Sequence, residues 1–226
     1  MIKLENVVKI YKSGQEEVRA LNGLTLEIGK GEFIVLAGPS GSGKTTMLNV
    51  ISGIEKPTEG RVLFEGKDIG KMDEDSLSDL RLKRIGFVFQ TYNLIPVLTA
   101  FENVEIILAL RGVKLEERKR RIGEIFEVLG LKGLENRFPK ELSGGQQQRV
   151  AIARAIVGNP AVVLADEPTA NLDSKNALNV MNLMLKLNEE FGTTFIFATH
   201  DPMIIELGKR IIRLRDGRIV EDVRKG

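Results

Sequence analysis

Residues 32–53, "EFIVLAGPSGSGKTTMLNVISG", decide the fold, because a short apolar run leads into a glycine-rich loop and then into a helix-like run. Gly38, Gly43, Lys44 and Thr45 match G-x-x-x-x-G-K-[ST], a pattern typical of phosphate-binding loops. Glycines let backbone N–H groups curl round an anion, and the helix N-terminus adds positive potential. The alternative is a glycine-rich turn without a ligand. The Lys-Thr ending and both flanking runs favour a nucleotide phosphate site instead.

Each polar side chain of this loop has an expected role. Lys44 is expected to reach the β- and γ-phosphates, and the Thr45 hydroxyl to ligate Mg²⁺. The other residues expected to line the nucleotide are Gly38, Ser40, Gly41, Ser42, Gly43 and Thr46.

Two acidic residues follow a second apolar run, "AVVLADEP" at residues 161–168. Ligands of open parallel sheets bind outside the carboxyl ends of the strands, and the phosphate loop follows its own strand. Asp166 is therefore expected to hold Mg²⁺, directly or through water, and Glu167 to orient or deprotonate the attacking water. A strand that merely ends in acidic loop residues is the alternative.

His200 is the single histidine of the chain and follows the apolar run "TTFIFAT" at residues 193–199. Its predicted place is the same carboxyl edge, where it could hydrogen-bond the γ-phosphate. A structural role is the alternative, since histidines often serve one. A metal role is not expected, because the chain has no cysteine and no second histidine.

The order of these runs predicts an α/β fold. Short apolar runs at 161–165 and 193–199 flank a predicted helix that ends at Gly192. Strand–helix–strand alternation indicates a mainly parallel sheet. Residues 1–66 read as short strands with turns, which predicts an N-terminal antiparallel β subdomain. Residues 92–158 are helical in character, with apolar residues at helical spacing at Ile122, Ile125, Phe126 and Leu129.

We therefore predict a single cassette over residues 1–226, with a core and β subdomain at about 1–90 and 159–226 and a helical subdomain at about 91–158. The net charge is +2, so no strong field favours nucleic acid or acidic membranes. The basic stretch "EERKRR" could indicate a nucleic-acid patch, but its acidic residues favour a solvated helix face. The apolar runs are far shorter than the roughly 18 residues of a membrane helix, and the first residues lack the apolar core of a signal peptide. A cytoplasmic protein is expected, with any membrane role supplied by a partner.

A second glycine-rich helix start lies at "LSGGQ", residues 142–146. Ser143 and Gln146 form the S-x-x-Q pattern of a capping box. Capping does not explain Gly144 and Gly145, each of which costs roughly 1 kcal/mol against alanine inside a helix. Glycines at a positive helix end suit a second anion contact.

Taken together, these motifs resemble the ATP-binding subunit of ABC transporters. "GPSGSGKTT" is similar to the Walker A loop, "VVLADE" to the Walker B strand, and "LSGGQ" to the family signature formed by Ser143, Gly144, Gly145 and Gln146. His200 resembles the switch histidine.

Three further positions take roles from this resemblance alone. Gln90, in "GFVFQTYNL", resembles the glutamine that reaches Mg²⁺ and the attacking water. Asp173, in "NLD", resembles the D-loop aspartate, and the resemblance implies that it contributes to nucleotide binding. Tyr11, in "VKIYKSG", matches the aromatic residue that stacks on adenine, although a surface tyrosine near a terminus is common.

The resemblance implies an ATPase with ATP and Mg²⁺ as cofactors. It also implies a dimer of two copies, with ATP between the Walker A loop of one copy and the signature of the other. An integral-membrane permease is expected to dock near residues 90–101, where an apolar loop carries Leu94, Ile95, Pro96, Leu98 and Phe101. These residues could instead fill the core of the insertion. Docking would place the protein at the inner face of the cell membrane.

A finer resemblance is to the lipoprotein-releasing and macrolide-exporter branch, carried by "NLIPVLTAFENV" and "LSGGQQQRVAIARA". A regulator of a cell-division or other non-transport membrane complex is the alternative. An ABC ATPase of DNA repair would need a long coiled-coil insertion, and no sustained heptads occur. A translation factor would carry two cassettes in one chain. A non-enzymatic regulator would typically lack Glu167 or Lys44. No nucleic-acid partner is expected.

Overall fold

The computed structural model describes residues 1–14 and 16–225. Packing divides the chain into two compact units, one from Met1 to Arg81 and from Thr194 onward, the other from Leu82 to Thr193. The division falls inside helix α2 (Glu74–Arg84). It groups the strand that carries Asp166 with the helices, so the expected boundaries at about 90 and 159 stay a prediction.

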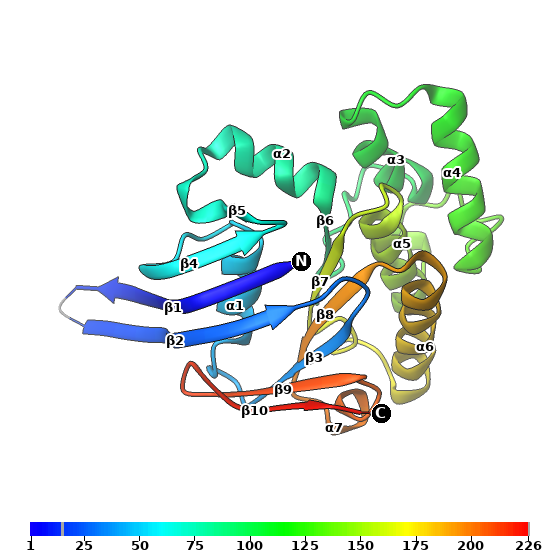
Figure 1. Ribbon diagram of the computed structural model, residues 1–226. Coiled ribbons are helices and arrows are strands. Elements are labelled where there is room, and N and C mark those ends of the chain that lie inside the picture. The colour runs from blue at the N-terminus through cyan, green and yellow to red at the C-terminus, as the bar shows by residue number, and fades with distance from the viewer. Residues whose placement is uncertain (15, 226) are drawn as a thin grey trace. The chain divides into compact units, whose positions relative to one another are not determined.

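The first unit contains an antiparallel sheet with strand order β2-β1-β4-β5 (Figure 1). Its strands are β1 (Ile2–Ser13), β2 (Glu16–Ile28), β4 (Glu59–Phe64) and β5 (Lys67–Asp68). Alternate residues of β2 are buried from Leu24 to Ile28, as expected for a sheet with one solvated face. The N-terminal antiparallel sheet is thus as predicted, but β1 and β2, at 12 and 13 residues, are longer than the short strands expected.

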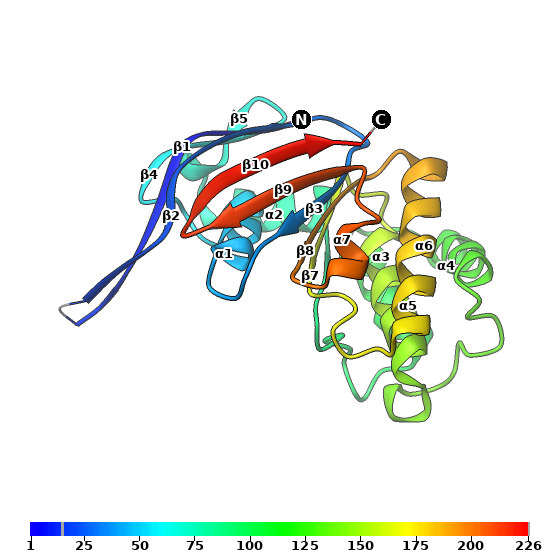
Figure 2. The same ribbon diagram turned by 90° about the horizontal axis from the view of Figure 1, so that it is seen from below.

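The first unit also contains four strands in the order β10-β9-β3-β8. They are β3 (Phe33–Ala37), β8 (Thr194–Thr199), β9 (Arg210–Arg215) and β10 (Arg218–Arg224). β3 pairs in parallel with both β8 and β9, and β9 pairs antiparallel with β10 (Figure 2). All five residues of β3 and all six of β8 are buried, which explains their unbroken apolar sequence.

Short helices complete the first unit. They are α1 (Lys44–Ile51), the 3-10 turn η1 (Ile69–Lys71), the greater part of α2, and α7 (Pro202–Ile205). α1 follows β3 and packs beside β8, β2 and β4. The phosphate loop is thereby held between a buried strand and a packed helix.

The second unit contains one pair of parallel strands and four α-helices besides the end of α2, counted over its described residues. Its elements are β6 (Ile85–Val88), α3 (Ala100–Leu110), α4 (Leu115–Val128), the 3-10 turn η2 (Pro139–Glu141), α5 (Gly144–Ile156), β7 (Val162–Asp166) and α6 (Ser174–Phe191). β6 pairs with β7, and α5 packs against α3, α4, α6 and β6.

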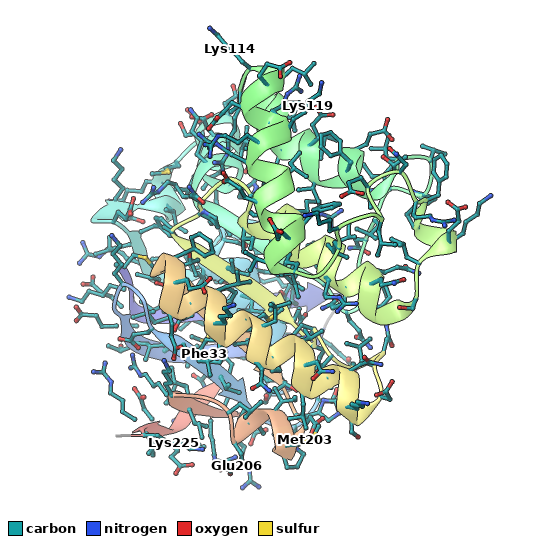
Figure 3. All side chains as sticks on the ribbon, turned by 90° about the vertical axis from the view of Figure 1, so that its right-hand side faces the viewer. Phe33, Lys114, Lys119, Met203, Glu206 and Lys225 are labelled. Atoms are coloured by element: carbon teal, nitrogen blue, oxygen red, sulfur yellow. The ribbon has the colours of Figure 1, made fainter. Side chains whose placement is uncertain are left out.

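The helical pattern from residue 115 is confirmed, since Ile122, Ile125 and Phe126 are buried in α4. Figure 3 shows Lys114 and Lys119 at the N-terminal end of this helix. The predicted helix end at Gly192 is also confirmed, because Gly192 caps α6 in the left-handed conformation with φ of 62°.

The stretch "RIIRLRDGRIVED", residues 210–222, folds into two strands, β9 and β10, joined by a turn. Asp216 and Gly217 have φ of 49° and 69°, the left-handed pair that a tight hairpin turn requires. α2 and β6 are additional elements that were not predicted.

Across the residues that the structure describes, none of the helices has the length and apolar character needed to cross a membrane.

Candidate functional site

The phosphate loop owes its shape to its glycines. Gly43 has φ of 102° and stands directly before α1. A Cβ there would lie 2.5 Å from the backbone oxygen of Ala20, so close packing as well as the left-handed backbone requires glycine. A Cβ on Gly38 would collide with the backbone oxygen of Leu214. The loop therefore keeps the narrow curve that brings N–H groups toward an anion.

Lys44 lies buried under this loop. Its Nζ donates to the carbonyl oxygens of Gly38 at 2.8 Å and Pro39 at 3.0 Å. The Ser42 hydroxyl is also buried and has no hydrogen-bond partner in the described part of the chain. An unpaired buried hydroxyl is costly. A phosphate oxygen would give it and the ammonium group a partner, so the loop fits a phosphate chain.

His200 and the phosphate loop line the same hollow of the first unit. Gly38, Pro39, His200, Pro202, Ile205, Glu206 and Arg213 surround it. His200 follows β8 and is exposed. Glu206 and Lys225, labelled close together at the lower edge of Figure 3, form an ion pair of 2.9 Å at its rim. The histidine is thus on the phosphate-loop side of the unit, as predicted.

Tyr11 lies on β1 and exposes 38 % of its surface. Its hydroxyl donates to Glu55 Oε2 at 2.6 Å, and its oxygen lies 3.5 Å from Thr46 Oγ1 of the phosphate loop. Burial, followed by the hydrogen bond to Glu55, raises the pKa of the Tyr11 phenol. Tyr11 is therefore close to the loop and held in one orientation.

In the second unit, Asp166 is the last residue of β7 and Glu167 follows it. Both are partly buried. Glu167 has φ of 45°, a left-handed conformation that is uncommon for a non-glycine residue. Its carbonyl accepts from the Ala170 N–H at 3.2 Å in the turn that leads on. The chain thus turns sharply at Glu167, immediately after the strand ends.

The signature opens α5 with the predicted capping box. The Ser143 hydroxyl accepts from the Gln146 N–H at 3.3 Å, and Gln146 Oε1 accepts from the Ser143 N–H at 2.8 Å. A Cβ on Gly144 would lie 3.0 Å from the Tyr92 hydroxyl, which is tight. A Cβ on Gly145 would meet only an ordinary contact, 3.6 Å from Asn176 Oδ1. Packing therefore accounts for Gly144 and leaves Gly145 without a reason inside this chain.

Gln90 and the NLD segment are connected within the second unit. Asn171 Nδ2 donates to the Gln90 carbonyl at 2.8 Å. Asp173 caps α6 by accepting from the Asn176 N–H at 2.9 Å, and bonds to the Asn176 backbone and side chain lower the pKa of its carboxyl. Asp173 thus has a structural task in addition to the nucleotide contact expected of it.

The predicted magnesium ligands belong to both units. Thr45 lies in the first unit, and Gln90 and Asp166 lie in the second. This ligand set stays a prediction. Among the described residues, no three His, Cys, Asp or Glu side chains are grouped so as to hold a metal ion.

Three residues around the site were missed by sequence reasoning: Lys9, Glu55 and Arg154. Lys9 is two positions before Tyr11 on the same strand, so the two-residue period of a strand could have placed both on one face. Glu55 is 44 residues from Tyr11 and carries no local signal. Arg154 donates to the carbonyls of Asn93 at 2.6 Å and Tyr92 at 2.9 Å, across 61 and 62 residues.

Comparison with known proteins identifies relatives that match nearly the whole chain. A family model for ABC transporters matches residues 21–170. The uncharacterized ABC transporter ATP-binding protein MJ0796 of Methanocaldococcus jannaschii is 51 % identical over 225 residues, covering 97 % of this chain and 95 % of that protein. A macrolide export ATP-binding/permease protein MacB of Syntrophobacter fumaroxidans is 43 % identical, and the match covers 97 % of this chain but only 31 % of MacB.

The fold is also similar to solved structures. A dimeric structure of the MJ0796 cassette in a post-hydrolysis state bound to ADP and Pi has a TM-score of 0.91 at 48 % identity, with both chains fully covered. The predicted fold class is confirmed by this match. With the phosphate loop, the acidic strand end and the signature in the family's order, the chain belongs to the ABC transporter family, as an ATP-binding subunit that hydrolyses ATP and uses Mg²⁺.

Proposed function

We propose that this ATPase works as a head-to-tail pair of identical subunits and drives an integral-membrane partner. The observation that carries the pairing is the N-terminal end of α5. Ser143 is exposed there, and a Cβ at Gly145 would make only an ordinary contact of 3.6 Å with Asn176. An exposed helix N-terminus with positive potential suits an anion. The solved relative MJ0796 is dimeric, and packing within this chain does not require Gly145, so we assign this helix end to the ATP of a second copy.

Roles at the phosphates follow from side-chain chemistry. Lys44 would exchange its two backbone carbonyl partners for β- and γ-phosphate oxygens, and Ser42 would gain the partner that it lacks. Thr45, Asp166 and Gln90 would hold Mg²⁺, which neutralises phosphate charge when bound. Tyr11 would stack on adenine.

Glu167 would accept a proton from the attacking water or orient it, and His200 would hydrogen-bond the γ-phosphate. The sharp turn at Glu167 supports this assignment, because strained backbone outside glycine is concentrated at functional sites.

The membrane partner would dock on the loop between Gln90 and α3. Val97 exposes 78 % of its surface and Pro96 is exposed, whereas Leu94, Ile95, Leu98 and Phe101 are partly buried. Some residues of the predicted apolar patch are therefore open to a partner, and the others pack partly within this chain. Similarity to MacB, whose chain combines ATP-binding and permease parts, supports a macrolide-exporter or lipoprotein-releasing type.

The test uses Glu167→Gln, which keeps the size of the side chain and removes the base. Hydrolysis is expected to slow at least about 100-fold while ATP with Mg²⁺ still binds, the scale of a lost general base. Trapped ATP should then convert the variant into a dimer on gel filtration. Turnover within about threefold of the parent would reject the role of Glu167. A variant that holds ATP yet elutes as a monomer would reject the pairing.

A further inference from the structure

The Tyr11 side chain is braced by neighbours from three parts of the first unit. Its hydroxyl donates to Glu55 Oε2 at 2.6 Å, and Glu55 lies in the loop after α1. Lys9, on the same strand, places Nζ 5.2 Å from the centre of the ring. The phenol oxygen lies 3.5 Å from Thr46 Oγ1 of α1. Orientation of the ring is therefore fixed at its hydroxyl and at one face.

The acceptor of this bond is itself fixed. Glu55 Oε1 accepts from Asn49 Nδ2 of α1 at 3.0 Å, and Glu55 Oε2 lies 3.1 Å from Lys9 Nζ. Lys9 also donates to the Lys56 carbonyl at 3.0 Å. Burial raises the pKa of the Glu55 carboxyl, but bonds from Tyr11, Asn49 and Lys9 outweigh it and lower that pKa. Glu55 is thus an ionised acceptor at neutral pH.

An aromatic ring that is already fixed loses little freedom when a flat base stacks on it. A side chain that must be immobilised on binding reduces affinity instead. The brace also ties Tyr11 to α1, whose first residue is Lys44 and which packs beside β2 and β4 (Figure 1). The separation between the ring and the phosphate loop is therefore set by one helix.

We propose that Glu55, supported by Lys9, is a positioning residue that fixes Tyr11 as the platform for the adenine ring at a set distance from the phosphate loop. The inference rests on the proposed stacking role of Tyr11. This role differs from that of an ion pair that only stabilises the fold. A residue that fixes the stacking platform affects binding of the adenine base and leaves binding of the phosphates unchanged.

Two probes separate these effects: the non-hydrolysable analogue AMP-PNP with Mg²⁺, and inorganic tripolyphosphate with Mg²⁺, which has no base. Glu55→Ala is expected to weaken AMP-PNP binding about fivefold, because the freed Tyr11 side chain must then be immobilised on binding. Tyr11→Phe should weaken AMP-PNP binding by a similar factor. Neither should change tripolyphosphate binding by more than about twofold. Glu55→Gln is the matched control, since its amide oxygen still accepts from the phenol, and it should retain most of the affinity.

A double-mutant cycle supplies the decisive comparison. Adding Glu55→Ala to Tyr11→Phe should cause no further loss, because the bond is already gone. Additive losses, or an equal loss for tripolyphosphate, would overturn the proposal. Tyr11→Ala distinguishes the stacking role of Tyr11 from the positioning role of Glu55. If it leaves AMP-PNP binding unchanged, the stacking role fails and the brace with it. If it weakens binding while Glu55→Ala does not, only the brace is wrong.

Discussion

At the scale of single residues, Arg210 of β9 joins segments that are far apart in the sequence. Its guanidinium donates to both carboxylate oxygens of Asp222 at 2.8 and 2.6 Å, to Glu32 Oε2 at 2.7 Å and to the Glu27 carbonyl at 2.9 Å. Only 6 % of Arg210 is exposed. A planar five-donor group satisfies all of these acceptors at once, which a lysine could not do.

We expect Arg210→Met to lower the free energy of unfolding by about 3 kcal/mol at pH 7, the lower end for breaking a buried ion pair, since both carboxylates keep some contact with water. Urea denaturation measures the change. Arg213→Met is the matched control on the same strand. Its 2.6 Å ion pair with Glu221 is half exposed at 45 % and 47 %, so the expected loss is below about 1 kcal/mol. Equal losses for both variants would contradict the argument.

Acid should reduce the difference in the free energy of unfolding between the parent and Arg210→Met. The bond from Arg210 is the largest cause of a lowered pKa at Asp222. A carboxyl whose folded pKa is below its unfolded value stabilises the fold above the unfolded pKa, about 3.9, and that stabilisation is lost as the pH falls through the folded pKa. The gap between the two proteins should therefore be smaller at pH 3 than at pH 7. A gap that is the same at pH 3 and pH 7 would assign the effect to packing alone.

Residue types with a fixed local pattern could be predicted, whereas residues that act across distance could not. Lys44, Glu167 and Ser143 were found because their motifs span a few neighbouring positions. Glu55 and Arg154 act through contacts 44 and about 60 residues away, and neither has a distinctive neighbourhood. Gly144 was noticed as part of a possible anion contact, which stays a prediction. Its close packing against the Tyr92 hydroxyl could not be foreseen, because Tyr92 is far from it in the sequence.

At the scale of elements, α5 holds the loop that follows Gln90. Tyr92 and Asn93 both have left-handed backbones, with φ of 59° and 48°, an arrangement that costs free energy outside glycine. Arg154 of α5 donates to both of their carbonyls. The helix that opens with the signature therefore also fixes the segment beside the proposed permease contact.

Arg154→Lys should release this loop while leaving α5 helical. One ammonium cannot reproduce a planar fork that reaches two carbonyls. Amide hydrogen exchange of residues 91–95 is expected to be about tenfold faster, as local opening becomes easier. Arg120→Lys on α4 is the control, because within the described part of the chain Arg120 bonds only to Glu117 and Glu124 on the surface of its own helix. Unchanged exchange in Arg154→Lys would show that other contacts hold the loop.

Elements with strong periodicity were predictable, and elements defined by their partners were not. α4 and α6 carry apolar residues at helical spacing, and β3, β7 and β8 read as unbroken apolar runs. α2 has one buried apolar residue, Leu77, so its sequence gives almost no period. β6 is four residues long and depends on β7 beside it. The hairpin at Asp216 and Gly217 was readable from its Asp-Gly pair, which is a strong turn signal.

At the scale of the whole molecule, the phosphate loop and the signature raise the question of how many copies form one catalytic centre. The phosphate loop belongs to the first unit and the signature to the second. The solved relative MJ0796 is a dimer. If each ATP of this protein is enclosed by two copies, damage to the exposed Ser143 must weaken association and leave the phosphate loop of the same chain intact.

We therefore expect Ser143→Arg to abolish the ATP-driven dimer of Glu167→Gln. Arginine would place bulk at an exposed helix start and would remove the hydroxyl that accepts from the Gln146 N–H. ATP binding to each monomer should stay within about twofold, since the phosphate loop is unchanged. Gel filtration with and without ATP measures association. Ser143→Thr keeps a capping hydroxyl with little added bulk and is the control, which should still dimerise. If the Ser143→Arg, Glu167→Gln protein dimerises with ATP as fully as Glu167→Gln, the signature is only a capped helix and the catalytic centre is complete within one chain.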